Sequence, residues 1–415
     1  MEASEFCNLL YQLAARQPGR NVELELNGVP VLIVQDIDAA NRVLRGNAAN
    51  YRKNLDWFRQ ALGASRLTED GEAWRVRRDA SQEFLTRFDR GKAFALACRH
   101  AEARAAAMLG RSGAEANRLD DGIFHEIAAG VMLELFFDRD LETAGVNVAD
   151  ISSMIAFGSE FSVVPPGQDL APSPEGLRTF LSTRNRVLRW LQSFRGDPVP
   201  GGTLLGALLE LDAEGREGFV LEHELTLFFA AGAETTSASM GWACYLLAKY
   251  PQVQDALRSA VREFWQGPER GWDALMRVEM LHRFIDEVLR VFPPTPLLGR
   301  LAVDADVLGA RAVRPGDNVM VSLMGLHHDG VDEDPFAIDV PLVLTGEGRR
   351  RRSMPFSSGA RSCPGGRFAL VNLASILSVF LPDARFERTS TGDPEFHWNT
   401  QLVHRGGQPV RMTRI

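Results

Sequence analysis

Cys363 is the strongest candidate for a chemical role in this chain, because it lies in the glycine-rich segment FSSGARSCPGGR at residues 356–367. An apolar run typical of a helix follows at residues 368–381. A cysteine at a helix entrance lies beside free backbone N–H groups and the positive end of the helix dipole, and both stabilise a thiolate. The position suits a metal ligand or a nucleophile. A nucleophile would also need a base, and no histidine occurs nearby in the sequence, so the fold would have to bring one from elsewhere.

Polar residues interrupt an apolar helix that the sequence predicts over residues 221–250, which Pro251 ends. The segment AGAETT at residues 231–236 contains a glycine followed by Glu234 and Thr235. Threonine side chains bond to carbonyls of the preceding turn and glycine weakens a helix, so the segment predicts a notch that could hold water or a diatomic ligand. The same pattern is compatible with a kinked helix that has only a structural role.

Two further patterns combine charged and aromatic residues at helical spacing. Glu287 and Arg290 lie three residues apart, a spacing typical of a solvent-exposed ion pair that contributes little to stability. Trp74 and Arg78 lie four residues apart at the start of a predicted helix, as they would on the edge of any amphipathic helix. Taken alone, neither pattern indicates a function.

Helices dominate the elements that must position these residues. Apolar residues spaced by three and four predict helices over residues 93–109, 123–137, 177–194, 222–250, 251–265 and 272–292. Alternating residues on either side of an Asn-Gly turn predict a hairpin over residues 22–34, and a second β-rich stretch is predicted over residues 298–323. We therefore predict a mostly α-helical protein with a small β-region.

Composition excludes several classes of protein. Of the 415 residues, 45% are hydrophobic and 24% are charged, which argues against a disordered, collagen-like or disulfide-stapled chain. The net charge of −8 gives no electrostatic case for binding nucleic acid or an anionic membrane. The charge is uneven, because residues 349–415 contain eleven arginines and four acidic residues. A local basic face is therefore expected.

The chain carries no recognisable signal for export. Glu2 and Glu5 stand where a secretory peptide needs positive charge, and no apolar run approaches the roughly 20 residues that span a bilayer. The four cysteines are far apart and form no CxxC pair, which argues against a zinc ribbon or a disulfide framework. We therefore predict a soluble, cytoplasmic protein without a membrane span.

The cysteine segment resembles, position for position, the haem-binding loop FxxGxRxCxG of the cytochrome P450 family. In that family the cysteine thiolate is the axial ligand of haem iron and donates electron density that favours O–O cleavage. The resemblance implies this role for Cys363 and a haem-binding loop over residues 356–366, which includes Phe356, Arg361 and Gly365. The implied cofactor is haem b, iron protoporphyrin IX.

The other patterns are similar to further motifs of the same family. AGAETT resembles its (A/G)Gx(D/E)T(T/S) motif, which implies that Glu234 and Thr235 deliver protons during oxygen activation. Glu287 and Arg290 resemble its ExxR pair, which has a structural role and holds the cysteine loop in place. The family usually adds an arginine in the segment before that loop. The segment FAIDVPLV at residues 336–343 lacks one, so we expect a substitute among residues 349–352.

The resemblance also implies how the haem propionates are held. Trp74 and Arg78 match the family's WxxxR motif, whose two side chains hydrogen-bond a propionate. Arg300 and Arg361 fall at the other positions where the family places propionate partners. Arginine suits this role because its planar guanidinium group binds a carboxylate with two hydrogen bonds.

The resemblance places the substrate pocket among mostly apolar residues. The predicted lining includes Phe161, Phe228, Phe229, Ala231, Leu297 and Leu298. Such a pocket suits a lipophilic small molecule. The implied fold is a single, triangular, mostly helical domain over residues 1–415, and the implied activity is that of a haem-thiolate monooxygenase that hydroxylates or epoxidises this substrate in secondary metabolism.

Electrons must then come from a separate protein, because the chain contains neither GxGxxG after a strand nor GxxxxGK[ST]. We expect a monomer that receives electrons from a ferredoxin or flavodoxin with its reductase. The basic residues expected to dock this partner are Arg349, Arg350, Arg351, Arg352 and Arg367. Two alternatives stay open: a peroxide-using or non-oxygenating haem-thiolate enzyme such as a dehydratase or isomerase, and a haem-binding protein without turnover.

Overall fold

Most of the chain can be followed in a computed structural model. The structure describes residues 3–26, 28–109, 118–119, 121–140, 148–160, 173–196, 201–328, 334–348, 352–399 and 401–415. The description below refers to these residues.

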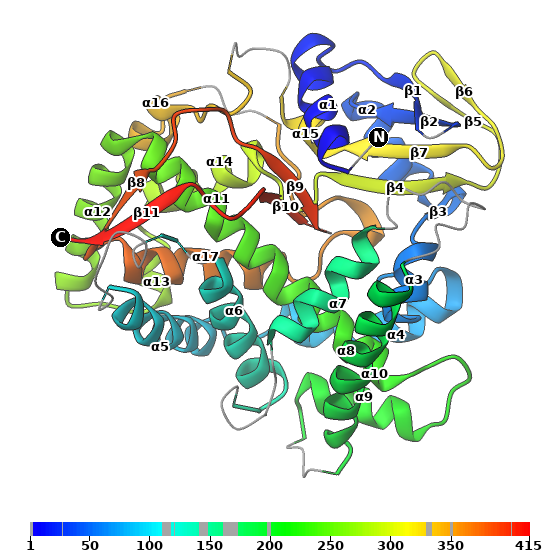
Figure 1. Cartoon of the computed structure of the whole chain (residues 1–415), viewed down its shortest axis with the longest axis horizontal. Coiled ribbons are helices and arrows are strands. Elements are labelled where there is room, and N and C mark those ends of the chain that lie inside the picture. The colour runs from blue at the N-terminus through cyan, green and yellow to red at the C-terminus, as the bar shows by residue number, and fades with distance from the viewer. Residues whose placement is uncertain are drawn as a thin grey trace.

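Helices form most of the molecule, which confirms the predicted mostly α-helical class (Figure 1). The α-helices are α1 (Ala3–Arg16), α2 (Ile37–Asn41), α3 (Asp56–Leu62), α4 (Gly71–Thr86), α5 (Arg90–Leu109), α6 (Asp121–Phe136), α7 (Val148–Glu160), α8 (Pro174–Ser193), α9 (Leu204–Ala213), α10 (Leu221–Phe229), α11 (Thr235–Lys249), α12 (Pro251–Gln266), α13 (Trp272–Leu275), α14 (Glu279–Val291), α15 (Leu323–His327), α16 (Val340–Thr345) and α17 (Gly366–Phe380). Short π- or 3₁₀-helical turns are η1 (Arg42–Gly46), η2 (Ala48–Asn50), η3 (Ala230–Glu234) and η4 (Gly359–Arg361).

The β-structure is small, as predicted. The strands are β1 (Val22–Leu26), β2 (Val29–Val34), β3 (Tyr51–Lys53), β4 (Leu297–Ala302), β5 (Asp306–Leu308), β6 (Arg311–Val313), β7 (Asn318–Ser322), β8 (Ala384–Arg388), β9 (Phe396–Asn399), β10 (Gln401–His404) and β11 (Val410–Arg414). The largest sheet has the order β1-β2-β7-β4-β3, with β2 and β7 parallel. The predicted hairpin thus joins strands β4 and β7 of the predicted second β-rich stretch in one sheet, and β5 and β6 pair with each other in a separate one.

A single buried helix organises the helical part. Every residue of α11 from Thr236 to Ala248 is buried, and Figure 1 shows the helix running through the middle of the molecule. A helix that is apolar on all sides has to be surrounded by other elements, and α6, α14, α17 and β8 pack against it. Trp242 of α11 stacks on Phe292 with ring centroids 4.0 Å apart. This packing fixes the segments before α11 and before α17 relative to each other.

The part of the chain that the structure describes contains no helix with both the length and the apolar character needed to cross a membrane.

Candidate functional site

The loop before α17 presents Cys363 in a defined backbone geometry. The Cys363 N–H donates a hydrogen bond of 2.8 Å to the Phe356 carbonyl. Gly359 has φ +77°, and a Cβ atom there would lie 2.1 Å from the Leu44 carbonyl oxygen, so only glycine allows the loop to approach η1 this closely. Gly365 is the N-cap residue of α17. The sequence therefore closes a tight turn in which the N–H of Gly365, at the start of α17, hydrogen-bonds the cysteine sulfur.

Cys363 opens into a cavity rather than into the protein core. The residue is exposed, in contrast to Cys7, Cys98 and Cys244, which are buried. Burial by the surrounding protein raises the pKa of the Cys363 thiol, and the Gly365 N–H and the charges of Arg66 and Lys53 act in the opposite direction. A positive charge bound directly to the sulfur, such as that of an iron ion, would therefore stabilise the thiolate most.

The cavity has a volume of about 380 Å³ and an apolar body. Apolar lining residues include Phe58, Met132, Ile155, Leu204, Leu227, Phe228, Leu297, Leu298 and Trp398. Of the residues predicted to line a substrate pocket, Phe228, Ala231, Leu297 and Leu298 are present. Phe229 lies off the cavity, packed against Phe137 and Trp190 at 5.6 and 5.1 Å between ring centroids. Phe161 lies outside the described residues.

One end of the cavity concentrates positive charge. Lys53, Arg66, Arg300 and Arg361 line it beside Trp74. Burial, with the neighbouring cations, lowers the pKa of Arg300 to about 10 and holds the pKa of Lys53 well below its usual range. Among the described residues, the buried Nη1 of Arg361 has no hydrogen-bond partner. Buried cations and an unsatisfied donor are costly unless anions bind them, so this end fits the two propionate carboxylates of haem b.

Each predicted propionate partner has a definite place in the structure. Trp74, Arg300 and Arg361 line the cavity, and the Arg361 guanidinium lies 3.9 Å from the centre of the Trp74 ring. Arg78 is absent from the described residues that line the cavity. Its Nη1 donates to Asp79 Oδ1 at 3.0 Å, and its guanidinium lies 5.7 Å from the Trp74 ring centre. The structure thus favours Arg66 over Arg78 as a partner for a carboxylate in this cavity.

Lys53 and Arg66 are cavity residues that sequence reasoning missed. Lys53 ends the short strand β3, where its Nζ donates to the Leu67 carbonyl at 2.6 Å. Arg66 lies in the turn between α3 and α4. Neither belongs to a spaced motif. The available signal was two basic residues shortly before the Trp74 motif, and a sequence does not show that such residues face inward.

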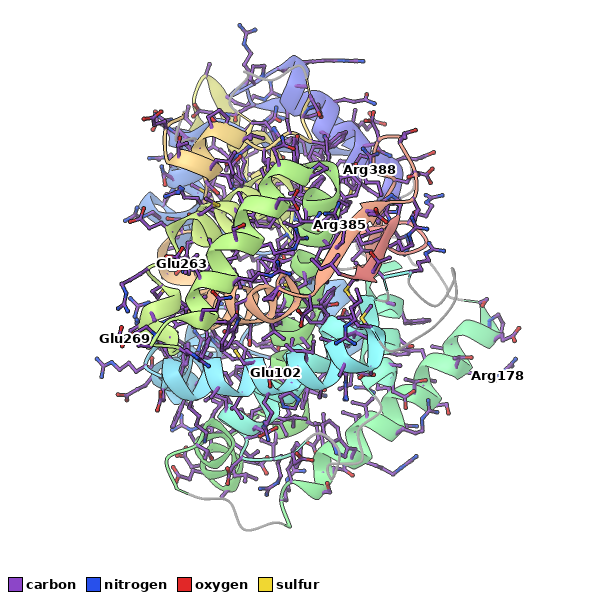
Figure 2. The ribbon with its side chains drawn as sticks, turned by 90° about the vertical axis from the view of Figure 1, so that its left-hand side faces the viewer. Glu102, Arg178, Glu263, Glu269, Arg385 and Arg388 are labelled. Carbon is purple, nitrogen blue, oxygen red and sulfur yellow. The ribbon has the colours of Figure 1, made fainter. Side chains whose placement is uncertain are left out.

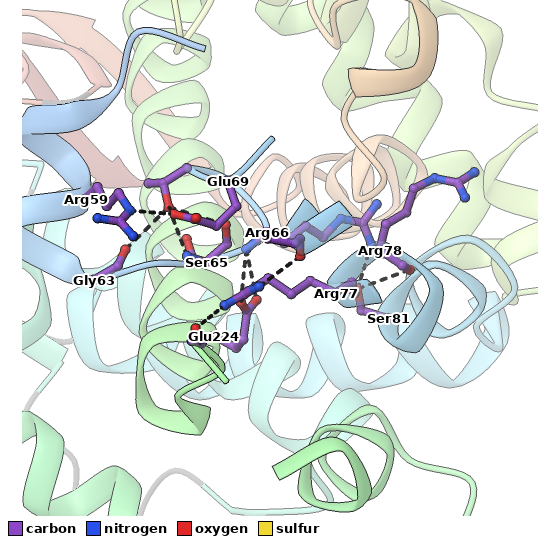
Figure 3. A network of polar contacts seen from close by, with 12 residues as sticks. Arg59, Gly63, Ser65, Arg66, Glu69, Arg77, Arg78, Ser81 and Glu224 are labelled. Atoms are coloured by element: carbon purple, nitrogen blue, oxygen red, sulfur yellow. Dashed lines mark hydrogen bonds and ion pairs between the residues drawn. The ribbon is translucent and has the colours of Figure 1, made fainter. Parts of the chain in front are cut away.

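A buried network holds Arg66 in place (Figure 3). The Arg66 backbone N–H donates to Glu224 of α10 at 3.0 Å, and its Nη1 donates to Ser81 Oγ of α4 at 2.7 Å. Arg77 Nε donates to the same Glu224 carboxylate at 2.7 Å. Figure 3 shows Glu224 beneath the side chains of Arg66 and Arg77. The network connects one cationic residue of the cavity to two helices.

Glu224 is expected to make stability depend on pH. Burial raises the pKa of Glu224 to about 7, although Arg66 and Arg77 act against this effect. The folded state therefore retains a proton that the unfolded state has lost, and this group's contribution to the free energy of unfolding falls as pH rises from the usual range of a glutamate to about 7. We expect the free energy of unfolding of Glu224→Gln, measured relative to that of the wild type, to be higher at pH 8 than at pH 5. Denaturant unfolding at both pH values measures this, and a pH-independent difference would contradict it.

The helix over the cavity is opened by a π-helical turn. The segment η3 (Ala230–Glu234) joins α10 to α11 where the sequence predicted a notch, and π-turns of this kind are frequent at functional sites. The hydroxyls of Thr235 and Thr236 donate to the carbonyls of Ala231 and Gly232 at 2.8 and 3.0 Å. Ala231 and Thr235 line the cavity. The Glu234 carboxylate instead contacts residues of α6 and α7.

Glu287 and Arg290 form a buried ion pair, not the solvent-exposed pair that their spacing alone suggests. Their side chains are 5% and 2% exposed, and two hydrogen bonds of 2.6 and 2.7 Å join them. Arg290 Nη2 also donates to the Ala337 carbonyl at 2.9 Å, and the Asp339 N–H donates to Glu287 Oε2 at 2.7 Å. Among the described residues, backbone groups are thus the further partners of this pair, and the buried Nη1 of Arg290 has no hydrogen-bond partner.

Of the four arginines expected as substitutes, the structure describes only Arg352. Arg349, Arg350 and Arg351 lie outside the described residues, and Arg352 is exposed. A backbone carbonyl and N–H suit such a pair because they offer an acceptor and a donor without adding a third buried charge.

His327 connects this ion pair to the cysteine loop, and sequence reasoning missed it. The Met354 N–H donates to His327 Nε2 at 2.9 Å, so Nδ1 carries the proton and donates to the Arg290 carbonyl at 3.0 Å. Burial lowers the pKa of His327 to about 4, which keeps the ring neutral. The segment leading into the cysteine loop is thereby tied to α14.

Comparison with known proteins agrees with this geometry. The cytochrome P450 family model matches residues 212–410. Mouse (Mus musculus) cytochrome P450 4X1 is 30% identical over 57% of this chain and 48% of its own length. The human ultra-long-chain fatty acid omega-hydroxylase is 29% identical over 48% of this chain and 40% of its own length. The Arabidopsis thaliana cytokinin hydroxylase is 26% identical over 78% of this chain and 67% of its own length. The chain spans about half the length of the first two of these relatives.

The matched residues include Thr235 and Cys363, which line the cavity, and Glu287 and Arg290, which form the buried ion pair. They also include Glu234, whose carboxylate contacts Ser152 and His125. The family's cofactor is haem b, which suits the cationic end of that cavity and the exposed thiol. On these grounds residues 212–410 are assigned to the cytochrome P450 family.

Proposed function

We propose that the protein is a haem-thiolate monooxygenase that hydroxylates or epoxidises a lipophilic small molecule. The observation that carries this proposal is the opening of Cys363 into an apolar cavity with a cationic end and with Thr235 in its wall. Haem b bound there would supply the activation of O₂ and the insertion of one oxygen atom into the substrate. Cys363 would bind the haem iron through its thiolate. Lys53, Arg66, Trp74, Arg300 and Arg361 would hold the propionates.

The remaining residues of the cavity would orient the substrate and exclude water. The lining between Phe58, Phe228 and Leu297 is apolar, so a lipophilic substrate binds by burying its own apolar surface. Thr295 and Gln401 add a polar pair, with 3.3 Å between Thr295 Oγ1 and Gln401 Oε1. Hydroxylation is also the activity named for the fatty acid and cytokinin relatives. A role in secondary metabolism, a cytoplasmic location and a monomeric state stay predictions.

Incorporation of oxygen from O₂ tests the proposal. The purified protein with haem would be mixed with a surrogate electron donor, NADPH, ¹⁸O₂ and a panel of fatty acids, terpenoids and aromatic compounds. One ¹⁸O atom in a product, with consumption of reductant, is the expected result. Product that forms from hydrogen peroxide but not from O₂ and reductant, or product that contains no ¹⁸O, would support the peroxide-using or non-oxygenating alternatives and overturn the proposal.

A basic groove on the cysteine-loop side is the proposed docking site for the electron donor. The groove has a volume of about 840 Å³ and is lined by Thr86, Arg87, Phe88, Arg90, Gly91, Glu269, Gly271, Trp272, Asp273, Ala274, Arg277 and Arg367. Glu269, one of these lining residues, is labelled in Figure 2. Arg367 follows the cysteine by four residues, so this charge lies close to the thiolate in the chain. Four arginines against two acids favour an acidic partner such as a ferredoxin or a flavodoxin.

Arg367→Glu is expected to weaken electron transfer without affecting haem binding. Reversing one charge at a partly exposed interface slows association, so the KM for the reduced donor should rise about tenfold at low ionic strength and much less at high salt. Arg178→Glu is the matched control, because Arg178 is an exposed residue of α8 that does not line the groove. Stopped-flow reduction at two salt concentrations measures the effect. Equal changes in the two variants would place the docking site elsewhere.

A further inference from the structure

The carboxyl group of Glu234 is held by two side chains from neighbouring helices. Glu234 Oε1 accepts a hydrogen bond of 2.7 Å from Ser152 Oγ of α7 and lies 3.3 Å from His125 Nε2 of α6. Ser152 Oγ also lies 2.9 Å from His125 Nδ1. The side chains of Glu234 and His125 are 15% and 9% exposed, so these contacts lie where water competes weakly. The neighbouring Thr235 lines the cavity, so the acid and the alcohol of the motif lie on different sides of the helix.

The hydrogen-bonding capacities of the three groups determine the direction of these contacts. An ionised Glu234 can only accept, so Ser152 uses its one hydroxyl proton on that carboxylate. Ser152 must then accept from His125, which means that Nδ1 carries a proton. Donation therefore runs from His125 to Ser152 to Glu234. A chain of donors in one direction is the arrangement through which a proton can be passed.

The surrounding charges let the His125 ring change its protonation state. Burial lowers the pKa of His125, and the negative charges of Glu234 and Glu126 oppose that effect. Other charged groups on the elements packed here have partners of their own: Glu126 with Arg104 of α5, Glu134 with Arg99 of α5, and Asp150 of α7 with Arg186 of α8. The charge on Glu234 therefore decides how readily the ring takes a second proton.

We propose that Ser152 and His125 are positioning residues that hold Glu234 between proton deliveries and then return a proton to it. The inference rests on the proposed function, in which Glu234 supplies protons to the cavity. When His125 is an imidazolium, its Nδ1 proton passes to Ser152 Oγ while the Ser152 hydroxyl proton passes to Glu234 Oε1. The imidazolium becomes a neutral imidazole, the carboxylate becomes a carboxylic acid, and Ser152 is unchanged.

The transfer also releases the acid. A neutral Glu234 no longer attracts the ring, so its side chain can turn toward Thr235 and the cavity at a lower cost. His125 regains its proton from water, to which 9% of its side-chain surface is open. The two residues thus link the timing of proton delivery to the protonation state of one buried histidine.

Variants of Ser152 in the haem-loaded enzyme test the relay. We expect Ser152→Ala to lower product formation about tenfold or more and to divert reductant to hydrogen peroxide, because a positioned proton donor has been disconnected. The solvent deuterium isotope effect on turnover should rise. Ser152→Thr keeps the hydroxyl and should restore coupling. Ser153→Ala is the matched control, since Ser153 is the exposed neighbour on the same helix. Alanine favours a helix, and thermal unfolding of both alanine variants separates an effect on folding from an effect on the relay.

A titration of His125 provides a readout that does not depend on turnover. Ring ¹³C signals of labelled full-length protein would be followed against pH in the wild type and in Glu234→Gln. We expect the pKa of His125 to fall in the variant, because the carboxylate charge that favours the imidazolium is lost. An unchanged pKa, or wild-type coupling in Ser152→Ala, would overturn the relay. A wild type that forms no product overturns the proposed function instead, and the titration then still decides whether the chain of contacts operates.

Discussion

Cys363→Ser is expected to abolish the strongly red-shifted Soret band of the reduced, carbon-monoxide-bound protein, together with all monooxygenase activity. The shift depends on a thiolate bound opposite carbon monoxide, and a serine hydroxyl is not ionised at neutral pH and donates far less electron density to iron. The cationic end of the cavity, with Arg300 and Arg361, is unchanged in this variant. We therefore expect haem to remain partly bound, with the spectrum of a ligand other than thiolate.

A cysteine remote from the cavity provides the control. Cys98 lies buried in α5, and burial raises the pKa of its thiol to about 12. Cys98→Ala should leave the position of the Soret band unchanged, although it removes a thiol from the same chain. A red-shifted band that persists in Cys363→Ser would exclude Cys363 as the ligand and would remove the basis of the proposed function.

Glu287→Gln should have the largest effect on folding. Removing one partner of a buried ion pair leaves the other charge uncompensated, which costs about 3–5 kcal/mol. Glutamine keeps only one of the two acceptor oxygens, so the negative charge opposite Arg290 is lost and the side-chain NH2 faces a donor, either Arg290 Nε or Arg290 Nη2 with the Asp339 N–H. Because His327 ties the same helix to Met354 at the start of the cysteine loop, we also expect weaker retention of haem.

The same helix supplies the matched control for this prediction. Glu279 is paired with Arg283 of α14, and the Glu279 side chain is 80% exposed. Glu279→Gln should change the free energy of unfolding by no more than about 1 kcal/mol, as is usual for surface pairs. Urea unfolding of both variants, followed by circular dichroism and by the haem absorbance, makes the comparison. Equal stabilities for the two variants would mean that the buried Glu287–Arg290 pair contributes no more to the free energy of unfolding than the exposed Glu279–Arg283 pair.

Short-range patterns accounted for the elements and for several cavity residues. The helical periodicities, the hairpin over residues 22–34 and the β-rich stretch over residues 298–323 correspond to observed elements, except that the helix predicted over residues 272–292 is divided into α13 and α14. A glycine-rich turn before a helix depends on local backbone conformation, so the exposure of Cys363 at such a turn could be expected from its neighbours alone. The polar segment at residues 231–236 likewise predicted an opened helix, because glycine and threonine act on their own turn.

Short-range patterns do not show whether a side chain is buried or which way it points. An i, i+3 spacing is the same for an exposed pair and a buried one, so only the packing of α14 against α16 and α17 separates Glu287 and Arg290 from Glu279 and Arg283. The backbone groups that complete the pair belong to no sequence pattern, because every residue carries them.

The sequence by itself therefore determined the cysteine loop, the polar turn in the central helix and the mostly helical class, since each depends on interactions within a few residues. The tertiary structure decided which charges face the cavity: it places Lys53 and Arg66 there and leaves Arg78 outside. It also turned Glu234 toward Ser152 and His125, which lie on helices distant in the chain. These outcomes depend on long-range packing, and helical spacing constrains only neighbours one or two turns apart.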